Sequence, residues 1–250
     1  MPTALKIENV VVDFMGFKAI NGISMEVDEG ELRVIIGPNG AGKTTLMDLI
    51  TGKTAPSLGK ISFNGKAITG KSIHSIAADY GIGRKFQGPN LFDNMSVWDN
   101  LEISLAGFST ALKTLFYHKT REIKSKIEET LKIINLYEEK DEFACNLSHG
   151  QRQWLEIGMV MMQSPKLIIF DEPTAGMTAD ETYKTGKMIK NLQGKHTILV
   201  VEHDMDFVKQ VAEKVSVLHM GKMFAEGTFD EISNNEKVIQ IYLKDEENEA

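Results

Sequence analysis

The stretch that decides the fold is Leu32-Arg33-Val34-Ile35-Ile36-Gly37-Pro38-Asn39-Gly40-Ala41-Gly42-Lys43-Thr44. Its first five residues form a short, mostly apolar run, which is typical of a buried strand. The next eight match the glycine-rich loop that joins a strand to a helix and binds phosphate. The glycines let backbone N–H groups converge on phosphate oxygens, and the following helix points its positive end at the same place. A plain glycine-rich turn is the alternative, but the strand before and the helix after favour the phosphate loop.

Individual residues of this loop have separate roles in binding a nucleotide. Lys43 adds a positive charge between the β and γ phosphates, and the Thr44 hydroxyl is a natural Mg²⁺ ligand. We therefore expect ATP and Mg²⁺ as cofactors. The residues expected to contact the nucleotide here are Gly37, Pro38, Asn39, Gly40, Ala41, Gly42, Lys43, Thr44 and Thr45.

The composition is that of an ordinary globular chain. Apolar residues make up 42% of the 250 residues, enough for a substantial core, and the net charge of -7 disfavours nucleic acid as a partner. The single cysteine, Cys145, cannot form an internal disulfide, and the first residues do not resemble a signal peptide. Apolar runs stay far below the roughly 20 residues that a membrane span needs. We expect a cytoplasmic protein whose membrane role comes through a partner.

The first 70 residues have the pattern of strands and turns. Residues 5–14 are rich in β-branched side chains, which favour strands. Residues 61–63 are followed by Asn64-Gly65, a strong signal for a tight hairpin. An antiparallel β subdomain is therefore expected around the phosphate loop.

Strand signals return in the second half of the chain. Residues 167–170 and 197–201 are short apolar runs, and a helix between them is expected to begin at Thr178. Glu181, three residues on, completes a capping box. Strands that alternate with helices predict a mainly parallel sheet.

Between these regions, residues 96–163 have a helical period. One apolar helix face is expected from Ile123, Ile127, Leu131 and Ile134. With no internal repeat or linker visible, we expect this helical lobe to be inserted into one domain spanning residues 1–250. The expected parts are the β subdomain and phosphate-loop core over residues 1–90, the helical subdomain over 91–163, and the rest of the α/β core with the tail over 164–250.

The C-terminal part carries a hairpin signal near Gly221 and a second capping box at Thr228 and Glu231. Residues 245–250 are too acidic and polar to bury, and we expect this tail to be frayed.

Two adjacent carboxylates, Asp171-Glu172, follow the expected strand at residues 167–170. Open α/β sheets bind ligands at the carboxyl ends of their strands. Asp171 can hold the Mg²⁺ shell, and Glu172 can orient and polarise the attacking water, since phosphoryl transfer needs mainly positioning and charge stabilisation. A solvated pair of acids at a strand end is the alternative, which the phosphate loop upstream makes the weaker one.

The segment Leu147-Ser148-His149-Gly150-Gln151 adds a second anion-facing element. Ser148 can cap the following helix, and Gln151 stands at the capping-box position. A plain cap explains those two residues but not the whole segment. The segment resembles the signature motif of ATP-binding-cassette ATPases, whose usual form has glycine in place of His149. The resemblance implies that Ser148, Gly150 and Gln151 contact a nucleotide held by a second subunit.

The resemblance covers essentially the whole chain and implies further site residues. Phe14, 23 residues before Gly37, stands where the family places an aromatic ring that stacks on adenine, with Phe17 as the second candidate. Gln87 matches the glutamine that contacts Mg²⁺ or water and couples to the helical lobe. His203 matches the histidine that contacts the γ phosphate. Without the resemblance, these would be core aromatics, a surface glutamine and a structural histidine.

Within this family the chain is most similar to ATP-binding subunits of branched-chain amino acid importers, and particularly to their urea-transporting branch. The similarity rests on Ile36-Gly37-Pro38-Asn39, Arg84-Lys85-Phe86-Gln87, Leu147-Ser148-His149-Gly150-Gln151-Arg152-Gln153-Trp154-Leu155-Glu156, Asp171-Glu172-Pro173-Thr174-Ala175-Gly176-Met177-Thr178 and Val201-Glu202-His203-Asp204. Thr178 departs from the family pattern, because an aspartate usually stands there and reaches across the dimer. That departure puts the cross-subunit contact in doubt.

The resemblance implies a P-loop NTPase core of the RecA-like type, with an N-terminal antiparallel β subdomain and an inserted helical subdomain. It also implies a head-to-tail dimer with itself or a paralogous ATP-binding subunit. Two transmembrane permease subunits and a solute-binding protein would be partners, with this chain on the inner face of the membrane.

Three other functions compete with this interpretation. ATPases that extract lipopolysaccharide have closely similar motifs, and the hydrolytic site does not separate the two. Soluble cassette ATPases that act on DNA or ribosomes generally carry a coiled-coil insertion or two tandem cassettes, neither of which this sequence contains. A P-loop kinase outside the family would leave the segment from Ser148 to Gln151 unexplained.

Overall fold

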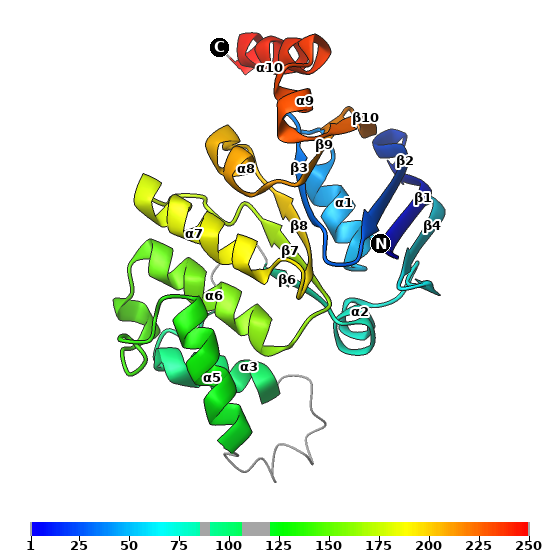
Figure 1. Ribbon diagram of the computed structural model, residues 1–250. Coiled ribbons are helices and arrows are strands. Elements are labelled where there is room, and N and C mark those ends of the chain that lie inside the picture. Colours follow the sequence, from blue (N-terminus) through cyan, green and yellow to red (C-terminus); the bar gives the residue numbers. More distant parts are fainter. Residues whose placement is uncertain (1, 86–90, 107–120, 250) are drawn as a thin grey trace.

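The computed structural model describes residues 2–85, 91–106 and 121–249. An antiparallel sheet and a mainly parallel sheet enclose helix α1 (Lys43–Ile50), and further helices cover the opposite face of the parallel sheet (Figure 1). None of the helices in these residues combines the length and apolar character needed to span a bilayer.

The antiparallel sheet is built from the N-terminal part of the chain. Its strands β1 (Thr3–Phe14), β2 (Phe17–Asp28), β4 (Leu58–Phe63) and β5 (Lys66–Ala67) lie in the order β2-β1-β4-β5. β4 and β5 pair antiparallel, with Phe63 opposite Lys66, so the Asn64-Gly65 turn forms the expected hairpin. The predicted N-terminal antiparallel subdomain is confirmed.

The parallel sheet forms the centre of the molecule. Its strands are β3 (Leu32–Ile36), β6 (Ile82–Lys85), β7 (Leu167–Asp171), β8 (Thr197–Val201), β9 (Lys214–His219) and β10 (Lys222–Gly227). The order is β10-β9-β3-β8-β7-β6, and β10 alone pairs antiparallel, with β9. Every residue of β3, β7 and β8 is buried, because layers cover both faces of these strands.

The alternation of side chains along the central strands separates two hydrophobic clusters. Val34 and Phe170 belong to the cluster that includes residues of helix α6 (His149–Met162). Ile35 and Ile169 belong to the cluster that includes residues of α1. Successive side chains of a strand point to opposite faces of a sheet. The two clusters therefore lie on opposite faces of the parallel sheet.

Helices supply the outer layers and the lobe between β6 and β7. They are α2 (Ile73–Tyr80), α3 (Val97–Ala106), α5 (Arg121–Ile133), α6 (His149–Met162), α7 (Ala179–Leu192), α8 (Met205–Val211), α9 (Phe229–Ser233) and α10 (Glu236–Glu249). α5 buries Ile127 and Leu131 with Ile134 just beyond it, and Ile123 packs against the same cluster. The apolar helix face expected from the sequence is confirmed.

Local capping signals are confirmed, but the expectation for the tail is wrong. Capping boxes begin α6 at Ser148, α7 at Thr178 and α9 at Thr228. Instead of fraying, residues 245–249 continue α10 to Glu249. The helix is anchored near its start by buried Val238, and good helix formers such as glutamate then allow it to propagate.

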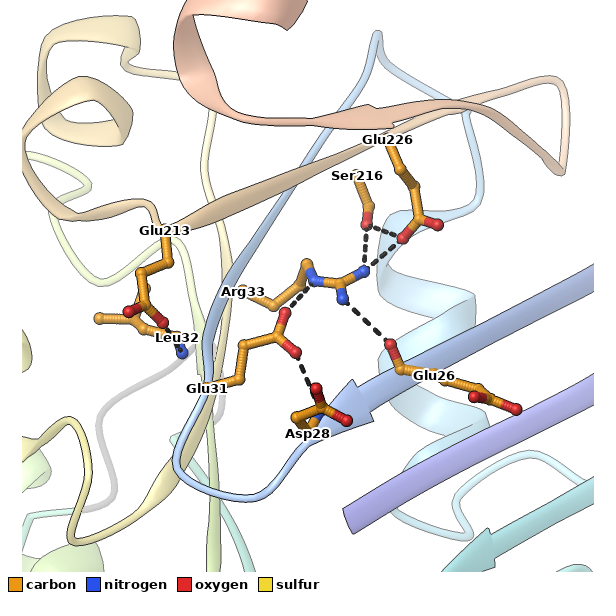
Figure 2. Close-up of polar contacts among 8 residues, drawn as sticks. All are labelled: Glu26, Asp28, Glu31, Leu32, Arg33, Glu213, Ser216 and Glu226. Atoms are coloured by element: carbon orange, nitrogen blue, oxygen red, sulfur yellow. Dashed lines mark hydrogen bonds and ion pairs between the residues drawn. The ribbon is translucent and has the colours of Figure 1, made fainter. Parts of the chain in front are cut away.

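One buried charge in β3 links the two sheets. The Arg33 side chain is fully buried and donates to the Glu31 carboxylate at 2.5 Å, the Ser216 hydroxyl at 3.0 Å and the Glu26 backbone carbonyl at 3.0 Å. It also pairs with Glu226 on β10, as Figure 2 shows. A charge removed from water needs such partners. This cluster ties β3 to β2, β9 and β10.

Candidate functional site

The phosphate loop runs from the end of β3 to the start of α1 and depends on two glycines. Gly37 and Gly42 have φ angles of 152° and 102°, a region that side chains disfavour. A Cβ on Gly37 would lie 2.2 Å from the Leu218 carbonyl oxygen, and one on Gly42 would lie 2.7 Å from that of Ala19. Glycine is therefore the residue that lets the loop pass between β2 and β9.

Lys43 turns back across the loop that precedes it. Its Nζ donates to the carbonyl oxygens of Gly37 at 2.6 Å and Pro38 at 2.9 Å. Thr44 is exposed beside it, and Thr45 is half-buried. An ammonium group and a hydroxyl thus lie together at the N-terminus of α1, where the helix end favours anions.

Asp171 ends β7 at the same edge of the sheet. In register it lies opposite Val201 of β8, which in turn pairs with Ile35 of β3. Its Oδ2 accepts a hydrogen bond from Arg84 at 2.6 Å. Its Oδ1 is buried and has no hydrogen-bond partner among the described residues. A buried carboxylate oxygen without a donor fits a cation or a metal-bound water.

The residues around Asp171 fit Mg²⁺ better than a metal held by protein alone. Within the described ranges, no three His, Cys, Asp or Glu side chains gather into a metal site. Mg²⁺ commonly uses one or two protein ligands and takes the rest from phosphates and water. Asp171 and Thr44 would supply the protein ligands.

Glu172 directly follows the strand in a left-handed conformation, with a φ of 49°. Its backbone N–H donates to the Val201 carbonyl at 2.9 Å, so the turn is held by the neighbouring strand. Strained backbone of this kind, when surrounding contacts enforce it, is found often at active sites. This turn places half-buried Glu172 directly after Asp171, at the carboxyl end of β7.

Glu202 is a functional candidate that the sequence reasoning missed. Its buried carboxylate accepts hydrogen bonds from the Thr174 backbone at 3.1 Å, the Thr174 hydroxyl at 2.6 Å and the His203 backbone at 3.1 Å. His203 itself is 67% exposed, with Nδ1 3.8 Å from Glu202 Oε2. Glu202 thus joins the loop after Glu172 to His203. Its signal in the sequence was an acidic residue directly after an apolar strand.

The signature segment lies elsewhere, at the start of α6. Ser148 and Gln151 cap that helix reciprocally, and Gln151 Nε2 also donates to Glu139 at 3.0 Å. His149 Nε2 lies 3.0 Å from the Ala175 carbonyl oxygen. The residues that follow Glu172 therefore contact the signature segment of the same chain.

Glu181 completes this contact from the first turn of α7. A Cβ on Gly150 would lie 2.3 Å from Glu181 Oε1, so a larger residue there would force the Glu181 side chain to move. Hydrogen bonds from the Thr178 backbone and hydroxyl lower the pKa of Glu181. Thr178, which replaces the usual aspartate, is occupied as the helix cap.

The chain resembles known proteins in both sequence and fold. Residues 20–175, more than half of the chain, match the family model described as ABC transporter. The chain belongs to the ABC transporter family. Its similarity to solved structures includes a nucleotide-free ATP-binding cassette from an ABC transporter, with a TM-score of 0.84 and 34% identity over 96% of this chain and 98% of that one. The ADP conformation of an ATP-binding cassette of an ABC transporter has a TM-score of 0.86 and 34% identity, covering 97% of this chain and 99% of that one.

Curated relatives that cover almost the whole chain are named for branched-chain amino acid transport. The chain is 35% identical over 251 residues to the high-affinity branched-chain amino acid transport ATP-binding protein BraF of Pseudomonas aeruginosa, covering 96% of this chain and 97% of that one. It is 36% identical over 252 residues to the probable branched-chain amino acid transport ATP-binding protein LivG of Methanocaldococcus jannaschii, covering 96% of both. The predicted family, fold class and ATPase activity are confirmed.

The aromatic residues expected from the ABC resemblance to stack on adenine lie at the β1–β2 turn. Phe14 and Phe17 pair across the β1–β2 turn and are 52% and 68% exposed, which rules out the core role left open by the sequence. β2 is tied near the phosphate loop through Gly221, which accepts from Asn21 at 2.7 Å and donates to Ala41 at 3.0 Å. Gln87 lies outside the described residues.

Proposed function

We propose that this chain is the ATP-binding and ATP-hydrolysing subunit of an importer that takes up branched-chain amino acids or small amides such as urea. The observation that carries the proposal is its similarity, over almost the whole length, to proteins named for branched-chain amino acid transport. The urea alternative rests on motif similarity alone. No residue of the chain is assigned to the solute.

We propose that ATP is bound between two subunits arranged head to tail. In one chain, α6 contributes to the cluster on one face of the parallel sheet and α1 to the cluster on the other. Exposed Ser148 at the start of α6 and the phosphate loop at the start of α1 then serve different nucleotides. Ser148, Gly150 and Gln151 of one subunit would face the γ phosphate bound by its partner, either a second copy or a paralogue.

In this proposal the phosphate loop and the end of β7 hold the nucleotide and its metal. Lys43 and the loop N–H groups bind the β and γ phosphates, while Phe14 offers its exposed ring to adenine. Thr44, Asp171 and Gln87 contact Mg²⁺ or its water shell. When bound, Mg²⁺ neutralises charge on the transferring phosphoryl group.

Hydrolysis is assigned to Glu172, directly after β7, and to His203, two positions after β8. Glu172 orients the attacking water and accepts its proton, and His203 contacts the γ phosphate. Glu202 positions His203 and the loop at Thr174 without touching substrate. Loss of the γ phosphate then removes the charge that joins the two subunits, and the dimer opens.

The same proposal places the chain against the inner face of a membrane. Two permease subunits would follow its opening and closing, and a solute-binding protein would deliver the solute to them. We further propose that residues 1–250 act as one ATPase domain, in which residues 91–163 form a helical subdomain between residues 1–90 and 164–250.

Reconstitution tests this function directly. The chain is copurified with its membrane partners, placed in proteoliposomes with ATP inside, and supplied with the solute-binding protein and labelled leucine or urea outside. We expect ATP-dependent accumulation of one solute and none with Glu172→Gln. Uptake of neither solute, alongside ATP-dependent export of a lipid, would reject the importer proposal.

A further inference from the structure

The end of strand β6 carries two consecutive buried cations. Arg84 and Lys85 pair in register with Ile169 and Phe170 of β7, one step before Asp171. Because successive side chains of a strand point to opposite faces, the two cations reach different layers. Arg84 extends toward α1, and Lys85 extends toward α6.

Arg84 bridges two acids that lie on separate elements. One guanidinium nitrogen donates to Asp171 Oδ2 at 2.6 Å, and another donates to Asp48 Oδ1 on α1 at 2.5 Å. The Asp171 and Arg84 side chains are only 1% and 4% exposed, so water does not screen this pair. The bridge joins the helix behind the phosphate loop to the strand that ends in Asp171.

This bridge sets the orientation of the Asp171 carboxylate. With Oδ2 held by Arg84, the carboxylate cannot rotate freely, and Oδ1 is the oxygen left without a hydrogen bond among the described residues. A planar guanidinium can hold two carboxylates at fixed positions, whereas a lysine ammonium is a point charge on a flexible chain. The residue type at position 84 is therefore matched to the bridge.

Lys85 anchors the same strand end from the other face. Its Nζ lies 3.3 Å from Glu156 Oε2, and the two side chains are only 4% and 9% exposed. Glu156 belongs to α6, the helix that Ser148 caps. The two cations and Glu156 also line a hollow of about 460 Å³ between α2, β6 and α6. β6 is thus fixed between the two layers, which keeps Arg84 in place.

We propose that Arg84, anchored by Asp48, is a positioning residue that presents Asp171 Oδ1 to the metal of a metal–nucleotide complex. The inference rests on the proposed function, because it assigns Asp171 to Mg²⁺. Neither Arg84 nor Asp48 touches the metal in this arrangement. Asp48 acts by holding Arg84, and Arg84 acts by holding Asp171.

The test measures metal-dependent nucleotide binding rather than hydrolysis. A fluorescent N-methylanthraniloyl ATP is titrated with wild type, Arg84→Gln, Arg84→Lys and Asp48→Asn in EDTA and over a range of Mg²⁺ concentrations. In EDTA all affinities should agree within about twofold. The Mg²⁺ concentration that gives half of the affinity gain should rise about tenfold in both Arg84 variants. Replacing a residue that supports a metal ligand commonly weakens metal affinity by about that factor or more. Asp48→Asn should shift it in the same direction by less.

Arg33→Gln is the matched control, because Arg33 is a buried arginine with two carboxylate partners in a cluster that does not include Asp171 (Figure 2). It should lower the melting temperature and leave the Mg²⁺ midpoint unchanged. Circular dichroism establishes folding, and Asp48→Asn carries the test if the Arg84 variants do not fold. An unshifted midpoint in a folded Arg84 variant, or in Asp48→Asn, would overturn the inference, as would an equal shift in Arg33→Gln. A wild type without any Mg²⁺ response would instead reject the metal assignment in the proposed function.

Discussion

The Thr174 hydroxyl donates to Glu202 Oε1 at 2.6 Å, and this buried bond joins the loop after β7 to the end of β8. Glu202 Oε2 accepts the His203 backbone N–H at the same time. The carboxylate therefore holds together the segments that carry Glu172 and His203. Adjacent strands of a parallel sheet place their carboxyl ends side by side, and Glu202 fixes their spacing.

Glu202→Gln should slow turnover without weakening ATP binding. The amide can accept from Thr174 but has only one oxygen, so the His203 N–H loses its acceptor. Misplacement of a catalytic group by about 1 Å can cost around 100-fold in rate, and we expect kcat to fall by up to about that much. Steady-state phosphate release separates kcat from KM. Glu226→Gln, which disturbs the Arg33 cluster instead, should lower stability and spare kcat; the reverse pattern would reject the positioning role.

Lys43→Ala should abolish ATP binding at micromolar concentrations. The ammonium is the side-chain cation of the phosphate loop, and it is held at the N-terminus of α1 by the Gly37 and Pro38 carbonyls. Equilibrium dialysis with labelled ATP measures the loss. Lys66→Ala removes an exposed lysine of β5, in the antiparallel sheet, and should bind normally. Retained affinity in the Lys43 variant would show that the loop is wrongly assigned.

Ser148→Arg should leave ATP binding to the monomer intact and stop hydrolysis. The arginine would block the start of α6, which is assigned to the partner's nucleotide. The change also removes a helix cap, at a cost of about 1 kcal/mol. Thr228→Arg removes the equivalent cap of α9 and should keep its turnover, which separates stability from the site. Normal phosphate release by the Ser148 variant would exclude the composite site.

Glu172→Gln should bind ATP but hydrolyse it roughly 10² to 10⁴-fold more slowly, because the amide cannot act as a general base. Since hydrolysis is what opens the dimer, this variant should accumulate an ATP-dependent dimer, with its paralogue present if the native pair is mixed. The dimer should disappear in ADP. Light scattering after size-exclusion chromatography, with a phosphate-release assay, measures both effects.

The matched control is Glu138→Gln, which changes an exposed glutamate in the helical region and should behave as wild type. Near-normal turnover by Glu172→Gln would remove Glu172 from the catalytic role. Slow turnover without ATP-dependent association with either partner would leave Glu172 as the base and reject the dimer cycle.

Features that depend on near neighbours could be predicted from the sequence alone. The phosphate loop, the Asn64-Gly65 hairpin and the capping boxes at Ser148, Thr178 and Thr228 each involve residues within a few positions of one another. Their geometry follows from local backbone preferences and hydrogen bonds. The tail expectation failed because it considered burial alone, and a helix can continue from an anchored start.

Contacts between distant residues were decided only by the tertiary structure. Arg84 and Asp171 are 87 positions apart and meet because β6 and β7 are neighbours in the sheet. Arg33 and Glu202 lie in or beside apolar strands, and β2, β9 and the Thr174 loop supply their distant hydrogen-bond partners. A buried charge is stable only with partners in place, and the order of strands, which no local pattern specifies, determines which partners are near.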